Sequence, residues 1–149
     1  MGLFDSLNIS ASALTAERVR MDVTAENLAN AQTTRTADGG PYRRKSVVLE
    51  QADGSTGFGA TLRAAMGVSG GGRAGGVQVA AIQEDTQAPR RVYDPGHPDA
   101  DADGYVAMPN IDTVSEMVDL ITSQRAYEAN VTAMQSAKAM FAKTLEILR

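Results

Sequence analysis

The chain has 149 residues, enough for one ordinary domain with a single core, and 18 acidic against 14 basic residues give a net charge of -4. This mildly acidic balance, with no long basic block, excludes the electrostatic footprint of a nucleic-acid-binding protein. Cysteine is absent, which excludes disulfides, thiolate metal sites and a cysteine nucleophile.

Residues 1–33 are predicted to form the N-terminal helix of a coiled-coil core. Apolar residues recur there at alternating steps of three and four, the a/d spacing of a coiled coil, and only Arg18 interrupts them. We expect the helix to fade near residues 27–30, because asparagine favours caps and turns. The apolar seam consists of Phe4, Leu7, Ala11, Leu14, Met21, Ala25 and Leu28.

The start of the chain also bears on targeting. It lacks the basic region and the unbroken apolar stretch of a secretory signal, so we expect no cleavable signal peptide. No stretch approaches the roughly 20 apolar residues that span a bilayer, so the chain is not expected to cross a membrane.

Residues 34–108 are predicted to form a small β-rich insertion. They hold most of the glycine and proline, and residues 47–49 and 77–82 are the two strand candidates. Residues 67–76, which contain six glycines, are a flexible linker by composition. This arrangement predicts a central β-hairpin with a glycine-rich connection.

Residues 109–149 are predicted to form the C-terminal helix of the core. Pro109 stops the preceding segment, and Thr113 and Glu116 have the spacing of a capping box, so the helix should begin near Asp112. Gln124 and Lys138 are the polar exceptions in its seam. The apolar seam positions are Leu120, Tyr127, Val131, Met134, Phe141, Leu145 and Leu148.

Each seam needs a partner, because long isolated helices are stabilised chiefly by burying a stripe. The other seam is the first partner within reach. The fold class predicted is therefore mainly α, with the terminal helices packed as an antiparallel coiled coil around a small β-rich insertion.

The only ligand-like motif is the segment 99–106, which matches the first half of an EF-hand calcium loop. The twelfth position should hold a bidentate glutamate, and here it is Asn110 after a proline. A polar turn is the interpretation we favour. His97 is the lone histidine, and the glycine run lacks the lysine of a P-loop. No catalytic, metal or cofactor site is predicted.

Several sequence motifs give the pattern a family likeness. NLAN at residues 27–30 and RAYEAN at residues 125–130 resemble the terminal motifs shared by flagellar rod and hook proteins. GPYRRK at residues 40–45 and VYDPGHP at residues 92–98 are similar to the short proximal members of the flagellar basal-body rod protein family. The likeness runs from end to end except over about residues 53–76.

The resemblance implies a structural subunit of the proximal rod that is not an enzyme and needs no cofactor or small-molecule substrate. Its terminal helices would assemble into a hollow helical drive shaft that transmits torque. The implied partners are other copies of the chain, other rod proteins and the flagellar type III export apparatus. The implied location is the periplasmic rod of the basal body, reached without a cleavable signal peptide.

Three alternatives stay open at this point. Another axial protein, of rod or hook type, would have the same class of function. A calcium-binding module would need a glutamate at the position of Asn110 and helices around Asp99. An enzyme, such as a wall hydrolase, would need paired carboxylates in a cleft, whereas the acidic residues here fall in predicted loops or on helix faces.

Overall fold

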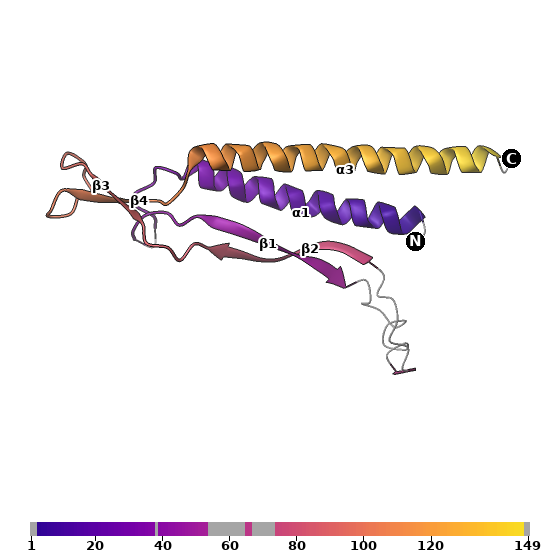
Figure 1. The fold of residues 1–149 in the computed structure, drawn as a ribbon, viewed down its shortest axis with the longest axis horizontal. Helices are drawn as coiled ribbons and strands as arrows, with labels where there is room; N and C mark the ends of the chain where they lie inside the picture. Colours follow the sequence, from indigo (N-terminus) through magenta and orange to yellow (C-terminus); the bar gives the residue numbers. More distant parts are fainter. Residues whose placement is uncertain (1–2, 38, 54–64, 67–73, 148–149) are drawn as a thin grey trace. The chain divides into compact units, whose positions relative to one another are not determined.

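The computed structural model describes residues 3–37, 39–53, 65–66 and 74–147. Two long helices, α1 (Leu3–Ala29) and α3 (Thr113–Ile147), enclose four strands in the chain order (Figure 1). The predicted mainly helical class with a small central β insertion is confirmed. None of the described helices is long and apolar enough to cross a bilayer.

The helix ends are set by short polar side chains. α1 ends at Ala29, where the Asn30 amide donates to the Glu26 carbonyl at 3.0 Å and residues 31–33 turn away from the helix. α3 begins directly after Asp112, whose carboxylate accepts the Val114 amide at 3.2 Å and the Ser115 hydroxyl at 2.7 Å. The capping residue is thus Asp112, and the side chain of Glu116 turns to other partners.

The insertion contains two strand pairs. β1 (Lys45–Asp53) pairs with β2 (Ala74–Glu84) in one sheet, and the Asp85 amide donates to the Arg44 carbonyl at 2.7 Å, so the start of β1 meets the end of β2. The two strands are therefore antiparallel (Figure 1). β2 begins at Ala74, so it includes the last three residues of the predicted glycine-rich linker. The other linker residues, 67–73, lie outside the described residues.

The second pair was not predicted from the sequence. β3 (Arg90–Tyr93) and β4 (Tyr105–Met108) are antiparallel, with Val92 opposite Val106. Val106 is fully buried, and it anchors this hairpin. Four-residue strands next to proline and glycine carry too little alternation to stand out in the sequence.

The chain divides into two compact units. One contains Met1–Arg18, Leu49–Ala80 and Arg125–Arg149, and the other contains Val19–Val48 and Ala81–Gln124. In the first unit, Ser12 ties β2 to α1, because its hydroxyl oxygen accepts the Val77 amide at 3.1 Å. The second unit holds most of the described buried side chains, which include Val23, Tyr42, Val106, Asn27, Glu116 and Ser123.

Candidate functional site: a polar junction

The candidate site is a junction of three chain segments within the second unit. The last turns of α1, residues 42–45 and the first turns of α3 meet there. Asn27 and Glu116 are 1% and 2% exposed, and both rank among the largest fully buried side chains described. Burying a polar group costs free energy unless the group is hydrogen-bonded. The hydrogen-bond partners of these two residues therefore decide whether the junction is stable.

Asn27 has a complete set of hydrogen-bond partners. Its amide nitrogen donates to the Lys45 carbonyl at 2.8 Å and to the Glu116 carboxylate at 3.2 Å. Its amide oxygen accepts the Tyr42 hydroxyl at 3.1 Å and the Lys45 backbone N–H at 2.9 Å. Two donors and two lone pairs are the full capacity of this side chain. Asn27 therefore ties α1 to both other segments.

Glu116 has a second partner in Arg44, the residue directly before β1. The Arg44 guanidinium donates to its carboxylate at 2.6 Å, and a second guanidinium nitrogen lies 3.7 Å from Asp119. The Arg44 side chain is 37% exposed, so this pair has one buried and one partly solvated member. The Lys45 ammonium and the Glu26 carboxylate form a further ion pair at 2.7 Å.

Two protonation equilibria respond to this environment. Burial raises the pKa of the Tyr42 hydroxyl above its ordinary value, and the nearby Glu26 carboxylate adds to the effect. The pKa of Lys45 is raised chiefly because its ammonium donates a hydrogen bond to Glu26. Both shifts favour the protonated state that the hydrogen-bonded junction requires.

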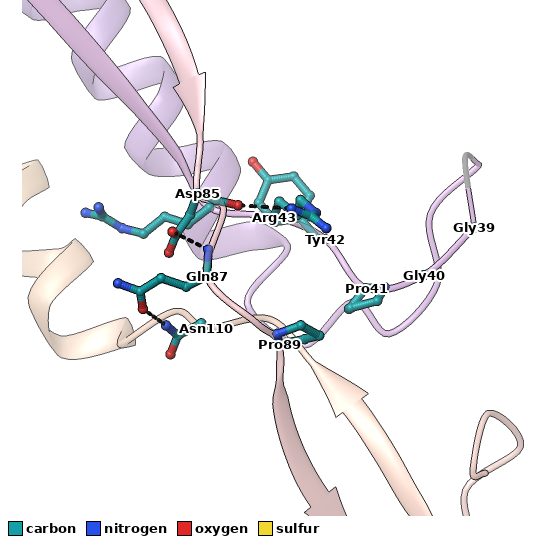
Figure 2. A pocket seen from close by; sticks show the side chains of 10 residues that line it. Gly39, Gly40, Pro41, Tyr42, Arg43, Asp85, Gln87, Pro89 and Asn110 are labelled. Carbon is teal, nitrogen blue, oxygen red and sulfur yellow. Dashed lines mark hydrogen bonds between the residues drawn. The ribbon is translucent and has the colours of Figure 1, made fainter.

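A shallow pocket lies beside the junction (Figure 2). Its walls are joined by hydrogen bonds, in which Asn110 donates to Gln87 at 2.8 Å and Arg43 donates to the Asp85 carbonyl at 3.4 Å. Its volume is about 170 Å³, below the ~300 Å³ at which ligand pockets begin. The lining residues are Gly39, Gly40, Pro41, Tyr42, Arg43, Arg44, Asp85, Gln87, Pro89 and Asn110.

The calcium-like segment is a hydrogen-bonded loop between β3 and β4. The Asp99 carboxylate accepts the Thr34 hydroxyl at 2.9 Å, and the Asp101 carboxylate pairs with Arg91 at 3.0 Å. Within the described part of the chain, no cluster of three or more acidic or histidine side chains could hold a metal ion. The carboxylates of Asp99 and Asp101 are thus used for contacts within the protein.

The predicted seam residues differ in exposure. Phe141 and Leu145 are 39% and 53% exposed, Phe4 lies in the first turn of α1, and Leu148 lies outside the described residues. The assembly role of the seam stays a prediction, as does the coiled-coil packing. The half-buried seam residues are Leu7, Leu14, Met21, Leu28, Leu120, Tyr127, Val131 and Met134.

The most buried positions lie beside the predicted seam. In α3 they are Glu116, Ser123 and Ala137. Ser123 directly precedes Gln124, and Ala137 directly precedes Lys138; these two polar residues of the predicted seam are exposed. Spacing of apolar residues could not find Asn27 and Glu116, because both are polar. The available signals were the NLAN motif and the capping-box pattern, which contain these residues but do not predict their contacts.

Comparison with known proteins gives one consistent likeness. A family model described as "Flagella basal body rod protein" matches residues 7–35, and one described as "Flagellar basal body rod FlgEFG protein C-terminal" matches residues 102–147. The chain is 54% identical to the flagellar basal-body rod protein FlgC of Bacillus subtilis, over 99% of both chains. It is 43% identical to the FlgC of Borreliella burgdorferi, over 100% of this chain and 99% of that protein. The FlgC of Escherichia coli O157:H7 is 42% identical, over 99% and 98%.

Proposed function

The chain belongs to the FlgC family of flagellar basal-body rod proteins, and from this premise we propose that its two long helices carry the contacts between subunits of a proximal rod. It is a structural subunit of the basal-body rod and not an enzyme. Its task is therefore to bind neighbours in a fixed geometry.

An exposed apolar face on α3 carries the proposal. Four residues of its first turns repeat at intervals of three and four, which places them on one side of a helix. Grouped exposed apolar side chains on a soluble chain mark interaction surfaces. Their exposed fractions are 63% for Val114, 45% for Met117, 57% for Val118 and 51% for Ile121.

The opposite side of the same turns is already occupied within the subunit. Glu116 and Ser123 are buried there, and the Asn27–Glu116 hydrogen bond links α3 to α1. One side of the helix thus packs inside the subunit, and the other is available to a neighbouring rod subunit. In the rod, we expect the two helices to form an antiparallel coiled coil that adds such outer contacts.

Contacts of this kind explain assembly. A surface that binds a different surface on the next copy produces an open helical filament when the rotation does not close a ring. Such a filament is a hollow shaft, which transmits torque through many buried apolar contacts. We propose that the chain reaches the periplasm through the flagellar type III export apparatus and binds further copies of itself and other rod proteins there.

Electron cryo-microscopy of isolated flagellar basal bodies tests the proposal. We expect density for this chain in the proximal rod, with Val118 and Ile121 within van der Waals contact of a neighbouring subunit. A map in which these residues face the central channel or solvent would refute the proposed interface. A basal body without the chain would refute its place in the rod.

A further inference from the structure

The hydrogen bonds around Asn27 can fix the register of the two helices, which heptad spacing alone leaves undetermined. A heptad pattern repeats every seven residues, so a helix that slides by seven residues presents equivalent positions again. Apolar contacts along such a stripe leave the register poorly determined. A buried polar residue with fixed partners removes this ambiguity, which is its best-attested use in coiled coils.

We propose that Asn27 and Glu116 are positioning residues that set the register of the last turns of α1 against the first turns of α3. This inference rests on the proposed function, because the register decides which helix faces a rod neighbour meets. Asn27 is the third residue from the C-terminal end of α1, and Glu116 is the fourth residue of α3.

These positions at the helix ends make slippage costly. A slip of seven residues would bring position 20 or 34 opposite Glu116, and position 109 or 123 opposite Asn27. Positions 34 and 109 lie outside the helices. Among the described contacts, the Ser123 hydroxyl has no hydrogen-bond partner, and it is too short to replace a carboxylate. A slipped helix would therefore leave at least one buried polar group without its partner.

The segment 42–45 strengthens the restraint, because it contacts both residues. The Lys45 backbone N–H donates to the Asn27 amide oxygen at 2.9 Å, and the Lys45 carbonyl accepts the Asn27 amide nitrogen at 2.8 Å. Arg44 holds Glu116 at 2.6 Å, and Tyr42 donates to Asn27 at 3.1 Å. Since these partners lie within four consecutive residues, both helices contact one short segment of the chain.

Spin-label distance measurements test this inference on the full chain. The sequence has no cysteine, so Ala25→Cys and Thr122→Cys, at two exposed positions, give one label on each helix. We expect one narrow distance distribution in the otherwise native chain. In Asn27→Leu/Glu116→Leu we expect a second population, displaced by about 10 Å along the helix for a one-heptad slip.

Two further variants separate positioning from folding. Ser123→Ala removes a buried polar group of the same helix that has no hydrogen-bond partner among the described contacts, so it should keep one distribution. Glu116→Gln keeps the length of the side chain and one of the two acceptor oxygens, so the contact with either Arg44 or Asn27 can persist, and this variant should also keep a single distance distribution. If the double leucine variant does not fold, Glu116→Met is measured in its place, since the remaining contacts of Asn27 are preserved.

A single native-like distribution in the leucine variant, or in Glu116→Met where the leucine variant does not fold, would overturn the inference. So would a second population in Ser123→Ala. The result is independent of the proposed place in the rod, because the labelled chain is measured in solution. A negative result from the basal-body map and a negative result here can therefore be told apart.

Discussion

The first and last turns of α3 differ in what they bury. In the first turns, Glu116 and Ser123 are almost inaccessible and the Glu116 carboxylate has two hydrogen-bond partners. In the last turns, Met140, Phe141 and Leu145 are 39% to 57% exposed. Phe141 and Leu145 are four residues apart, so they share a helix face. The first turns are therefore held by contacts within the chain on one side and expose apolar side chains on the other, and the last turns expose apolar side chains as well.

Phe141→Asp should have the largest effect, and it tests whether the last turns of α3 take part in assembly. We expect swimming motility and incorporation into basal bodies to be lost, while the chain stays soluble. In an assembled interface, an unpaired buried carboxylate costs several kcal/mol, and the lost ring adds roughly 3 kcal/mol. Motility plates and immunoblots of purified basal bodies measure both outcomes.

The thermal unfolding of purified Phe141→Asp is the matched control. Because the side chain is 39% exposed in the single chain, we expect the variant to lose less stability as a single chain than it loses in an assembled interface. Normal swimming with the variant present in basal bodies would show that this end of α3 does not carry the subunit contacts.

Gly76→Ala should give the next largest effect, through the contact between β2 and α1. Gly76 has a φ of +88°, and a Cβ atom there would collide with the Ser12 hydroxyl oxygen. That oxygen already accepts the Val77 amide and donates to the Ile9 carbonyl. We expect the free energy of unfolding to fall by about 2–3 kcal/mol, because alanine is strained in the left-handed region and a hydrogen bond of Ser12 is lost. Urea unfolding at constant m-value measures it.

Gly39→Ala separates strain from collision. Gly39 has a similar φ of +83°, and a Cβ atom there would meet nothing within 4 Å. The free energy of unfolding of this variant should fall by only about 1 kcal/mol, which is the cost of placing alanine in a left-handed backbone conformation. Equal losses for both glycines would mean that the close approach of β2 to α1 contributes nothing.

Tyr42→Phe tests the polar junction with a smaller change. The hydroxyl donates to Asn27 at 3.1 Å, and Asn27 keeps the Lys45 N–H when the hydroxyl is removed. We expect a loss of about 1 kcal/mol, typical of one hydrogen bond. Tyr93→Phe is the control, because Tyr93 is 65% exposed and should change stability by less than about 0.5 kcal/mol. Identical midpoints for the two variants would contradict a stabilising junction.

Alkaline pH should weaken the same junction. The folded-state pKa values of Tyr42 and Lys45 lie above their ordinary values of 10.0 and 10.5, so the folded chain holds both protons more tightly than the unfolded chain. Their contribution is complete below about pH 10 and is lost as pH rises through the folded values. The thermal midpoint of Glu26→Gln should fall less steeply above this pH than that of the wild type. If the thermal midpoints of Glu26→Gln and the wild type fall equally with rising pH, Glu26 does not contribute to this pH dependence.

The sequence predicted the elements well where spacing or strong end signals exist. The heptad spacing predicted both long helices, and the region of the β1–β2 hairpin followed from two short apolar runs. It missed the β3–β4 hairpin, because Val92 and Val106 meet only when the chain turns back through the eleven-residue loop 94–104. Such a pairing depends on tertiary contacts that a local pattern does not contain.

The candidate site was less predictable than the fold. Counting apolar residues favours a stripe through Gln124 and Lys138, both of which are exposed. The adjacent buried stripe contains Glu116 and Ser123, which such a count excludes. A buried carboxylate depends on Arg44 and Asn27 arriving from elsewhere in the chain. Polar burial of this kind is invisible to hydropathy and becomes visible only with the partners in place.

Asp101→Ala should have the smallest effect and tests the calcium alternative. The Asp101 carboxylate pairs with Arg91, but the two side chains are 63% and 61% exposed, so the pair adds little stability. The loop is held by backbone hydrogen bonds from Asp101 to Tyr105 and from Gly104 to Asp101, both 2.8 Å, which alanine retains. We expect a loss of about 0.5 kcal/mol or less and normal swimming. Calorimetric titration should show no sub-millimolar calcium binding, because Asn110 offers no bidentate carboxylate. A calcium module would reverse the ranking of Asp101→Ala and Phe141→Asp, since its function depends on the loop and not on the exposed end of α3.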